Sequence, residues 1–132
     1  MCIRDRFGGI FINAGTGHSI RHNEVYNLQS NGYTSYGLYC NATNTIVEGN
    51  KIHNLIPGMF SPTINGILVQ GGYVNVINNM IRLGLKEDGT SVESSIIFNG
   101  ISTAPGSESI VYFNSVYIGG NVTGTSANNS YC

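Results

Sequence analysis

The stretch "SIRHNEVYNL" (19–28) places one asparagine between two aliphatic residues that both suit burial. Ile20 precedes Asn23 by three positions, and Val25 follows it by two. The same spacing, aliphatic-x-x-Asn-x-aliphatic, returns three more times along the chain. The four copies read "IRHNEVYN" (20–27), "VEGNKIHN" (47–54), "VINNMIRL" (76–83) and "VYFNSVYI" (111–118). Recurrence of one pattern along a chain indicates a repeat architecture.

A second shared element lies upstream of each copy, a glycine followed by residues that alternate between faces. It reads "GIFI" (9–12), "GLYC" (37–40), "GILV" (66–69) and "GIST" (100–103). Alternation with a period of two is typical of a half-buried strand, and no long window shows the 3.6-residue period of a helix. The copies follow one another every 27–35 residues, with the extra length in loops. Each repeat therefore reads as about three short strands.

Short strands in a repeat near 30 residues predict an all-β fold, a right-handed single-stranded parallel β-helix of about four coils that is truncated at both ends. Equivalent strands of successive coils pair about 4.8 Å apart, so equivalent residues lie above one another. Each buried aliphatic is worth roughly 1.5–3 kcal/mol. Three inward stacks are expected: Ile20, Val47, Val76 and Val111; Val25, Ile52, Ile81 and Val116; and Ile10, Leu38, Ile67 and Ile101.

The repeated asparagine is expected to be the residue at which the chain turns between two strands of one coil. Such a turn needs a left-handed backbone, which Gly and then Asn adopt most readily. Stacked asparagine amides also hydrogen-bond to one another, at roughly 0.5–1.5 kcal/mol per bond. The predicted structural ladder is Asn23, Asn50, Asn79 and Asn114.

The composition argues against several classes of function. Only 10% of the 132 residues are charged, the net charge is −1, and no basic stripe exists, so we expect no nucleic-acid partner. No apolar run approaches the roughly 20 residues of a membrane span. The three cysteines, Cys2, Cys40 and Cys132, form neither a disulfide framework nor a zinc motif. No motif predicts a cofactor.

The two ends of the sequence look unlike the rest. "MCIRDR" (1–6) is unusually charged and resembles a translated sequencing adaptor, as found in metagenomic gene models, so we exclude it from fold reasoning. We expect the β-helix coils to occupy 7–118. Residues 119–132 are expected to begin a further, truncated coil that would stack on neighbouring coils of a longer chain.

The repeat over about 8–118 resembles the parallel β-helix of the pectate-lyase-like superfamily. That resemblance implies a fold more than a function, because lyases, hydrolases, tailspikes and adhesins share it. The segment "FNSVYIGGNVTGTSANNSYC" (113–132) is similar to repetitive secreted or surface proteins of Bacteroidota. The resemblance implies an extracellular or cell-surface location and a structural or adhesive role. A phage fibre is a further reading and would predict trimers.

The superfamily's enzymes use clustered carboxylates or calcium ligands, and this chain lacks such clusters. Glu24 and Glu48 do not share a repeat position, and "LKEDGTSVE" (85–93) has no calcium-loop spacing. His18 and His22 could converge across a turn, without a nearby acid. We therefore assign no catalytic and no metal-binding residue and lean against an enzyme. The alternative is a fragment of a carbohydrate-active enzyme, a polysaccharide lyase or glycoside hydrolase, whose catalytic coils lie outside this segment.

Two outward columns suit contact with a polysaccharide or a cell-surface glycan. Flat rings stack on sugar rings, and the arginine fork hydrogen-bonds to hydroxyl and carboxylate groups. The alternative is that these side chains only cover the sheet. One column, on the third strand of each coil, is Tyr26, His53, Arg82 and Tyr117. The other, on the glycine-led strand, is Phe11, Tyr39, Leu68 and Ser102, of which Phe11 and Tyr39 are the expected contacts.

Overall fold

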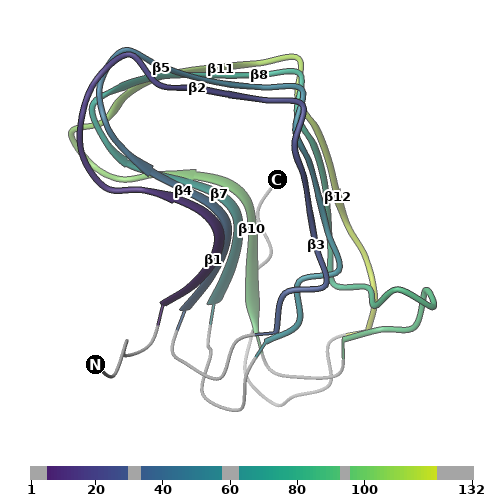
Figure 1. Ribbon diagram of the computed structural model, residues 1–132. Coiled ribbons are helices and arrows are strands. Elements are labelled where there is room, and N and C mark those ends of the chain that lie inside the picture. The colour runs from purple at the N-terminus through teal and green to yellow at the C-terminus, as the bar shows by residue number, and fades with distance from the viewer. Residues whose placement is uncertain (1–5, 30–33, 58–62, 93–95, 122–132) are drawn as a thin grey trace.

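A computed structural model describes residues 6–29, 34–57, 63–92 and 96–121. Within these ranges the chain forms twelve strands and no helix, arranged as three parallel four-stranded sheets (Figure 1). The first sheet contains β1 (Arg6–Ile12), β4 (Thr34–Asn41), β7 (Thr63–Gly71) and β10 (Ile97–Thr103). The second contains β2 (Ser19–Arg21), β5 (Thr45–Glu48), β8 (Tyr73–Ile77) and β11 (Glu108–Tyr112). The third contains β3 (Glu24–Tyr26), β6 (Lys51–His53), β9 (Met80–Leu83) and β12 (Ser115–Ile118).

Each coil contributes one strand to each sheet, so the predicted parallel β-helix of about four coils is confirmed. The chain passes from the first sheet to the second and then the third before starting the next coil, as Figure 1 shows. Strands that are neighbours in space therefore belong to successive coils. Side chains at one repeat position line up along the axis of the solenoid.

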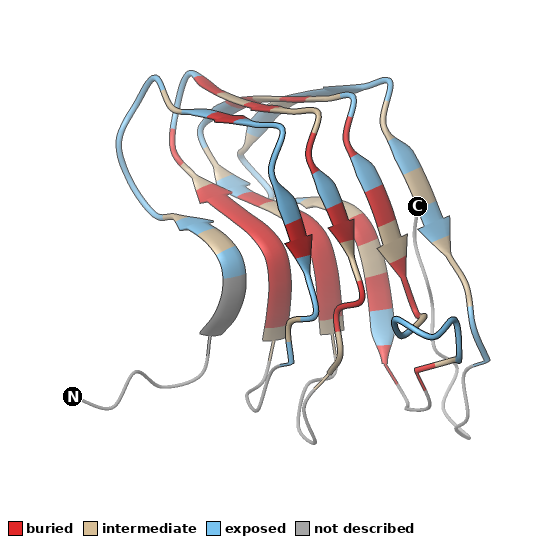
Figure 2. Cartoon of the chain, turned by 45° about the vertical axis from the view of Figure 1, so that its right-hand side comes forward, coloured by how far each residue is buried: buried red, intermediate tan, exposed pale blue. Residues whose placement is uncertain are grey.

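All three predicted aliphatic stacks are confirmed by the strand registers. Val47 pairs with both Ile20 and Val76, and the other two stacks pair in the same way. The two middle coils bury these residues completely or nearly so, which Figure 2 shows as red segments on the central strands. The apolar core is thus continuous from coil to coil, and its burial is the main stabilising contribution.

A column of glycines lies opposite the third sheet. A Cβ atom built on Gly37 would lie 2.4 Å from Ile52 Cγ2 and 2.7 Å from the carbonyl oxygen of Gly66. A Cβ on Gly66 would lie 2.5 Å from Ile81 Cγ2 and 2.6 Å from the carbonyl oxygen of Gly100. These separations are too short for any side chain, so glycine is required where the first sheet packs against the Val25–Val116 stack.

The asparagine ladder is confirmed as a stack of hydrogen-bonded amides. The backbone N–H and side-chain Nδ2 of Asn23 both donate to Asn50 Oδ1 at 3.0 Å. Asn50 donates in the same way to Asn79, and Asn79 to Asn114, at 2.9–3.0 Å. Each Nδ2 also reaches a backbone carbonyl, such as Val47 O for Asn79. The side chains therefore satisfy backbone groups at the corner between the second and third sheets.

The prediction that these asparagines adopt the left-handed backbone is wrong. The left-handed residue is the one before each of them, with φ between 54° and 65°: His22, Gly49, Asn78 and Phe113. Two residues form the corner, and each has a different role. The first reverses the chain direction, while the asparagine that follows keeps a negative φ and aims its amide along the axis. The sequence pattern did not separate these two positions.

The inward stacks become more exposed at the last coil. Val111, on β11, exposes 45% of its surface, whereas Val76 one coil earlier exposes none. Ile101 and Val116 in the same coil are only partly buried. Ile20 and Val25 in the first coil remain buried. The inward stacks of the second and third sheets are therefore less covered in the last coil than in the first.

Candidate functional site

The outer face of the third sheet carries the best-formed candidate site. Val25, Ile52, Ile81 and Val116 point inward, so the residues on either side of each point outward. The result is two rows that run along the solenoid. The first row is Glu24, Lys51, Met80 and Ser115, and the second row is Tyr26, His53, Arg82 and Tyr117. The second row is the predicted column, and the structure brings its four members together in register.

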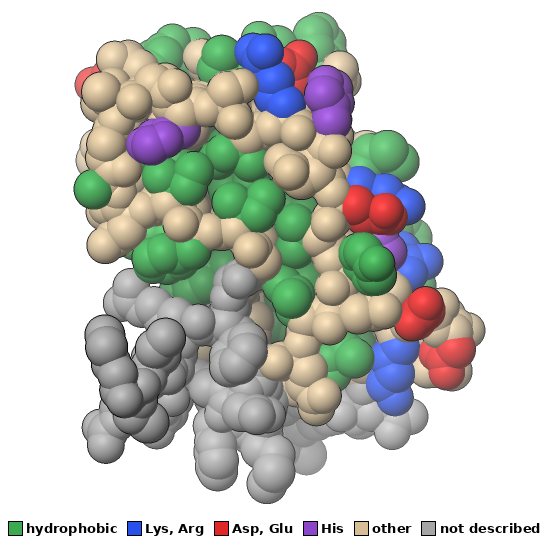
Figure 3. All heavy atoms as spheres, viewed as in Figure 1, with side chains coloured by type: hydrophobic (Ala, Val, Ile, Leu, Met, Phe, Trp, Pro, Cys, Tyr) green, Lys and Arg blue, Asp and Glu red, His purple; other side chains and the backbone are tan. Residues whose placement is uncertain are grey.

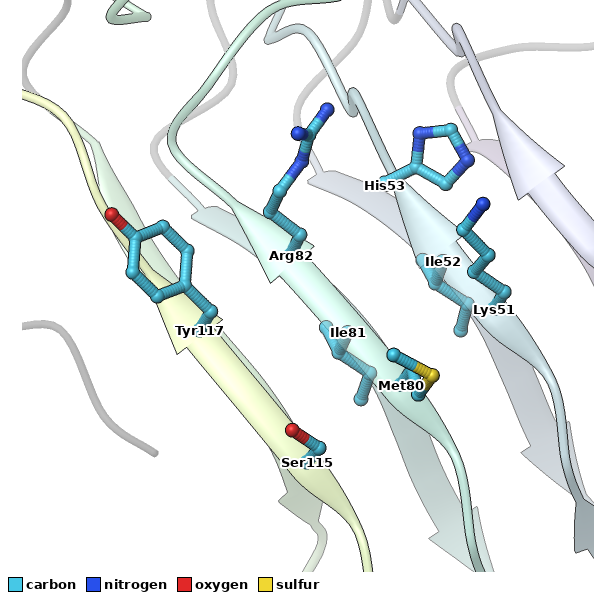
Figure 4. Close-up of a pocket in the computed structure, with 8 residues that line it drawn as sticks. All are labelled: Lys51, Ile52, His53, Met80, Ile81, Arg82, Ser115 and Tyr117. Carbon is cyan, nitrogen blue, oxygen red and sulfur yellow. The ribbon is translucent and has the colours of Figure 1, made fainter. Parts of the chain in front are cut away.

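A groove of about 290 Å³ lies over β6, β9 and β12, between members of the two rows (Figure 4). Figure 4 shows the rings of His53 and Tyr117 and the guanidinium of Arg82 rising from three neighbouring strands. The groove has both apolar and hydrogen-bonding walls. Its lining residues are Lys51, Ile52, His53, Met80, Ile81, Arg82, Ser115 and Tyr117.

Glu24 organises the N-terminal end of this face. Its Oε1 lies 2.7 Å from Lys51 Nζ and 2.9 Å from His53 Nε2. Hydrogen bonds from Lys51 and then from His53 hold the pKa of the Glu24 carboxyl below its usual range. The ring of His53 also stacks on Tyr26, with centroids 5.5 Å apart and planes 9° apart. His53 is therefore fixed between a carboxylate and an aromatic ring.

Arg82 is held by the side chain of Asn54, which is itself hydrogen-bonded to a second asparagine. Its Nη2 donates to Asn54 Oδ1, while Asn54 Nδ2 donates to Asn27 Oδ1 at 3.1 Å. Asn27 Nδ2 in turn donates to Glu87 Oε2 at 3.1 Å. Arg82 Nε and His53 Nδ1 are buried and have no hydrogen-bond partner within the described part of the chain. The guanidinium of Arg82 is therefore anchored, and its Nε–H can still donate a hydrogen bond.

The two predicted columns differ in how far their aromatic side chains are exposed. Tyr26 and Tyr117 expose 51% and 57% of their surfaces on the third sheet. On the first sheet, Phe11 and Tyr39 stack with centroids 4.3 Å apart, and Tyr36 meets Tyr39 edge-on. Phe11 is 44% exposed but Tyr39 only 4%. The Phe11–Tyr39 column therefore offers one free ring face, whereas the third sheet offers two separated rings with polar groups between them.

The carboxylates considered for acid–base or metal chemistry have different surroundings. Glu24 is the only carboxylate on β3, β6, β9 and β12, all of whose residues are described. Asp88 accepts hydrogen bonds from the N–H and Oγ1 of Thr90, which lower its pKa. Glu93 lies outside the described residues. No metal-binding cluster of His, Cys, Asp and Glu occurs among residues 6–29, 34–57, 63–92 and 96–121.

The two neighbouring histidines have different surroundings and form no shared site. His18 Nε2 lies 3.0 Å from the carbonyl oxygen of Ala14. The ring of His22 lies against Gly49 in the next coil, where a Cβ would meet its Nδ1 at 2.6 Å. Each histidine thus fills a local position in the turn it occupies.

Sequence reasoning missed the first row and the anchoring of Arg82. Lys51 and Met80 occupy the position between the repeated asparagine and the inward aliphatic, which must point outward in a strand. The Asn27–Asn54 pair was visible as the final asparagine in "IRHNEVYN" and "VEGNKIHN". Reading both flanks of each inward aliphatic would have identified the whole face.

The face combines exposed rings, cations and a neutral amide background. Figure 3 shows charged side chains at the upper right and along the right-hand margin, the side on which Figure 1 places β3 and β12, with hydrophobic side chains in the middle of the view and uncharged polar and backbone atoms around them. Rings offer flat apolar contact, and lysine and arginine donate to oxygen atoms. Such a surface can bind a ligand that has apolar faces and many hydroxyl groups.

No protein-family model matches the sequence, and neither a curated protein nor a solved structure matches the chain. The described residues include no helix long and apolar enough to cross a membrane. The geometry of the face is therefore the basis for assigning a role.

Proposed function

We propose that this chain is a structural or adhesive β-helix module of a secreted or cell-surface bacterial protein, and that it contacts polysaccharide through the outer face of its third sheet. The observation that carries the proposal is the groove of about 290 Å³ bordered by Tyr117, Arg82, His53 and Lys51. Tyr26 extends the same row by one more coil.

The chemistry of the groove favours a glycan over an apolar ligand. A sugar ring has an apolar face that packs on an aromatic ring and an equatorial rim of hydroxyl groups. Tyr117 supplies an exposed ring, and Lys51 and Arg82 supply donors at the rim. Rows repeated at strand spacing also suit a ligand that is itself a repeating polymer.

The finer assignment rests on the sequence. The likeness of 113–132 to segments of secreted Bacteroidota proteins, and of 8–118 to pectate-lyase-like repeats, supports an extracellular role. The low charge and the surface rich in amides and hydroxyls agree with that role. A stiff solenoid that presents side chains at fixed intervals is well suited to bridging a cell surface and a glycan.

A glycan array followed by calorimetry on the hits tests the proposal. We expect Tyr117→Ala to weaken binding about five- to tenfold, because an aromatic contact is worth about 1–1.5 kcal/mol. Tyr112→Ala is the matched control, since Tyr112 is also exposed in the last coil but lies on β11, in the second sheet. No binding to any glycan, or equal losses in the two variants, would refute the assignment to this face.

A further inference from the structure

Lys51 and Arg82 both border the groove, and they differ in their charge partners. Lys51 Nζ lies 2.7 Å from Glu24 Oε1, so its charge is largely balanced within the chain. No carboxylate of the described residues lies within salt-bridge distance of the Arg82 guanidinium. Arg82 therefore carries a positive charge on the wall of the groove that a ligand can balance.

The side chain of Asn54 holds this guanidinium in place and leaves most of its donors free. Asn54 is buried, and its Oδ1 accepts one hydrogen bond from Arg82 Nη2. A guanidinium has five N–H groups in a planar fork, and no described residue accepts from Nε or Nη1. One two-donor edge of the fork thus has no partner in the described part of the chain. A fork that is already fixed loses little side-chain freedom when it binds.

His53 lies opposite Arg82 on the neighbouring strand and offers a hydrogen-bond acceptor. Its Nε2 lies 2.9 Å from Glu24 Oε1, so Nε2 carries the proton and Nδ1 of the neutral ring is the acceptor. This Nδ1 and Arg82 Nε are both buried, and neither has a hydrogen-bond partner within the described residues. Figure 4 shows the guanidinium and the imidazole at the same end of β9 and β6. Buried polar atoms are nearly always satisfied, so two such atoms on adjacent strands indicate that oxygen atoms from outside the chain complete the site.

We propose that Arg82 is the oxyanion subsite of the groove, where it binds a sulfate or carboxylate group of the glycan, while a hydroxyl group beside that anion donates to His53 Nδ1. This inference rests on the proposed function and adds that the preferred glycan is acidic. Tyr117, which pairs with Arg82 in register on β12, packs on the sugar ring beside the anion. β6 and β9 each pair with a strand on both sides, so the subsite lies in the middle of the third sheet.

The chemistry of Arg82 favours an acidic sugar over a neutral one. A neutral sugar that covers the guanidinium removes water from a charge and replaces it only in part. An oxyanion accepts two parallel charge-assisted hydrogen bonds from the open edge of the fork, and these are shorter and stronger than hydrogen bonds between neutral groups. The whole chain has a net charge of −1, so it does not attract polyanions in general. Tight binding of an acidic glycan would therefore report this local site.

Titration of the full chain with sodium sulfate and, separately, with sodium acetate tests the subsite without a glycan. In NMR spectra of an isotope-labelled sample, the Arg82 Nε–H resonance is expected to shift in a saturable way with at least one of the two anions. Sodium chloride at equal ionic strength corrects for screening. The Arg21 Nε–H resonance is the internal control and should move less, because Arg21 Nε already lies 3.0 Å from Glu48 Oε2. No saturable shift at Arg82 with either anion would overturn the proposal.

Calorimetry with dextran, dextran sulfate and carboxymethyl dextran tests the link to the glycan, because the three polymers share one backbone and differ in their anionic groups. Wild type is expected to bind a charged form at least about tenfold more tightly than dextran. Arg82→Lys keeps the charge and a donor for Asn54 but loses the fork, so this advantage should fall about tenfold. Arg21→Lys makes the same change on the second sheet and should leave the advantage unchanged. Charged forms that bind wild type no better than dextran would overturn the proposal.

Failure of this inference and failure of the proposed function give different results. If Tyr117→Ala weakens the binding of neutral and charged glycans alike while Arg82→Lys weakens neither, the face binds glycan and the oxyanion subsite is wrong. An advantage of the charged forms that both arginine variants reduce equally would also overturn the subsite, because it would reflect charge in general. If Arg82 binds sulfate or acetate but no glycan binds the chain, the proposed function is refuted, and the assignment of the anion to a glycan falls with it.

Discussion

Asn79 Oδ1 accepts two hydrogen bonds from Asn50, one from the backbone N–H at 3.0 Å and one from Nδ2 at 2.9 Å. Both residues are buried. A single amide oxygen thus satisfies a backbone donor and a side-chain donor at a corner where the strand pairing is interrupted. The repeated asparagine is therefore a structural bridge between coils, and its removal should be costly in the middle of the ladder and mild at its end.

Asn79→Ala is expected to lower the free energy of unfolding by about 3–4 kcal/mol, because both donors of Asn50 lose their acceptor in a buried site. Urea denaturation followed by circular dichroism measures the change. Asn23→Ala is the control and should cost about 1 kcal/mol, since Asn23 is exposed and its backbone N–H still donates to Asn50 Oδ1. Similar costs at the two positions would contradict a ladder whose strength depends on burial.

Gly66→Ala is expected to destabilise the fold by about 3 kcal/mol, because the new methyl group overlaps both Ile81 and the backbone of the next coil. Gly71→Ala tests the same change in the same strand, β7. There the Cβ meets only Asn41 Oδ1, at the end of a side chain that can move, so the cost should stay below about 1 kcal/mol. Trimming the core with Ile81→Ala should not rescue Gly66→Ala, because the contact with Gly100 O remains.

Most of the fold could be predicted from the sequence, because the same side-chain pattern recurs in every coil of a solenoid. Four copies of one pattern fixed the registers of Val47 and Asn50 with their neighbours, and the structure agrees. The different roles of the two corner residues could not be predicted from the sequence. His22, Gly49, Asn78 and Phe113 share a backbone conformation but no side-chain property, so no consensus reveals them.

The candidate face could be predicted in part from the sequence. Period-two alternation placed His53 and Arg82 in one outward column, as the structure shows. Exposure could not be read in the same way, since Tyr39 and Tyr26 both occupy outward positions but only Tyr26 is open. Burial of an outward residue depends on the curvature of its sheet and on neighbours such as Tyr36, which no local pattern encodes.

Cys40 is expected to be inert in the folded chain. It is fully buried in the second coil, and burial raises the pKa of its thiol, so little thiolate forms. With Cys2 and Cys132, which lie outside the described residues, replaced by serine, Ellman's reagent should react with the native protein at least about 1000-fold more slowly than in urea. Rapid labelling of the native state would mean that this coil opens readily, in conflict with a continuous core.

The carboxyl of Glu24 is expected to titrate below its ordinary range, because Lys51 and then His53 donate hydrogen bonds to its charged form. A depressed pKa in the folded state stabilises the fold at pH values above the unfolded-state pKa, and this contribution disappears as the pH falls through the folded-state pKa. Lys51→Met keeps the stem and removes the donor, so the Glu24 pKa should rise, as NMR titration of the side-chain carboxyl would show. Lys86→Met, in the loop after β9, is the control and should leave the Glu24 pKa unchanged. A Glu24 carboxyl that titrates normally in wild type would mean that the first row is not organised by this pair, and that the groove is less ordered than its geometry indicates.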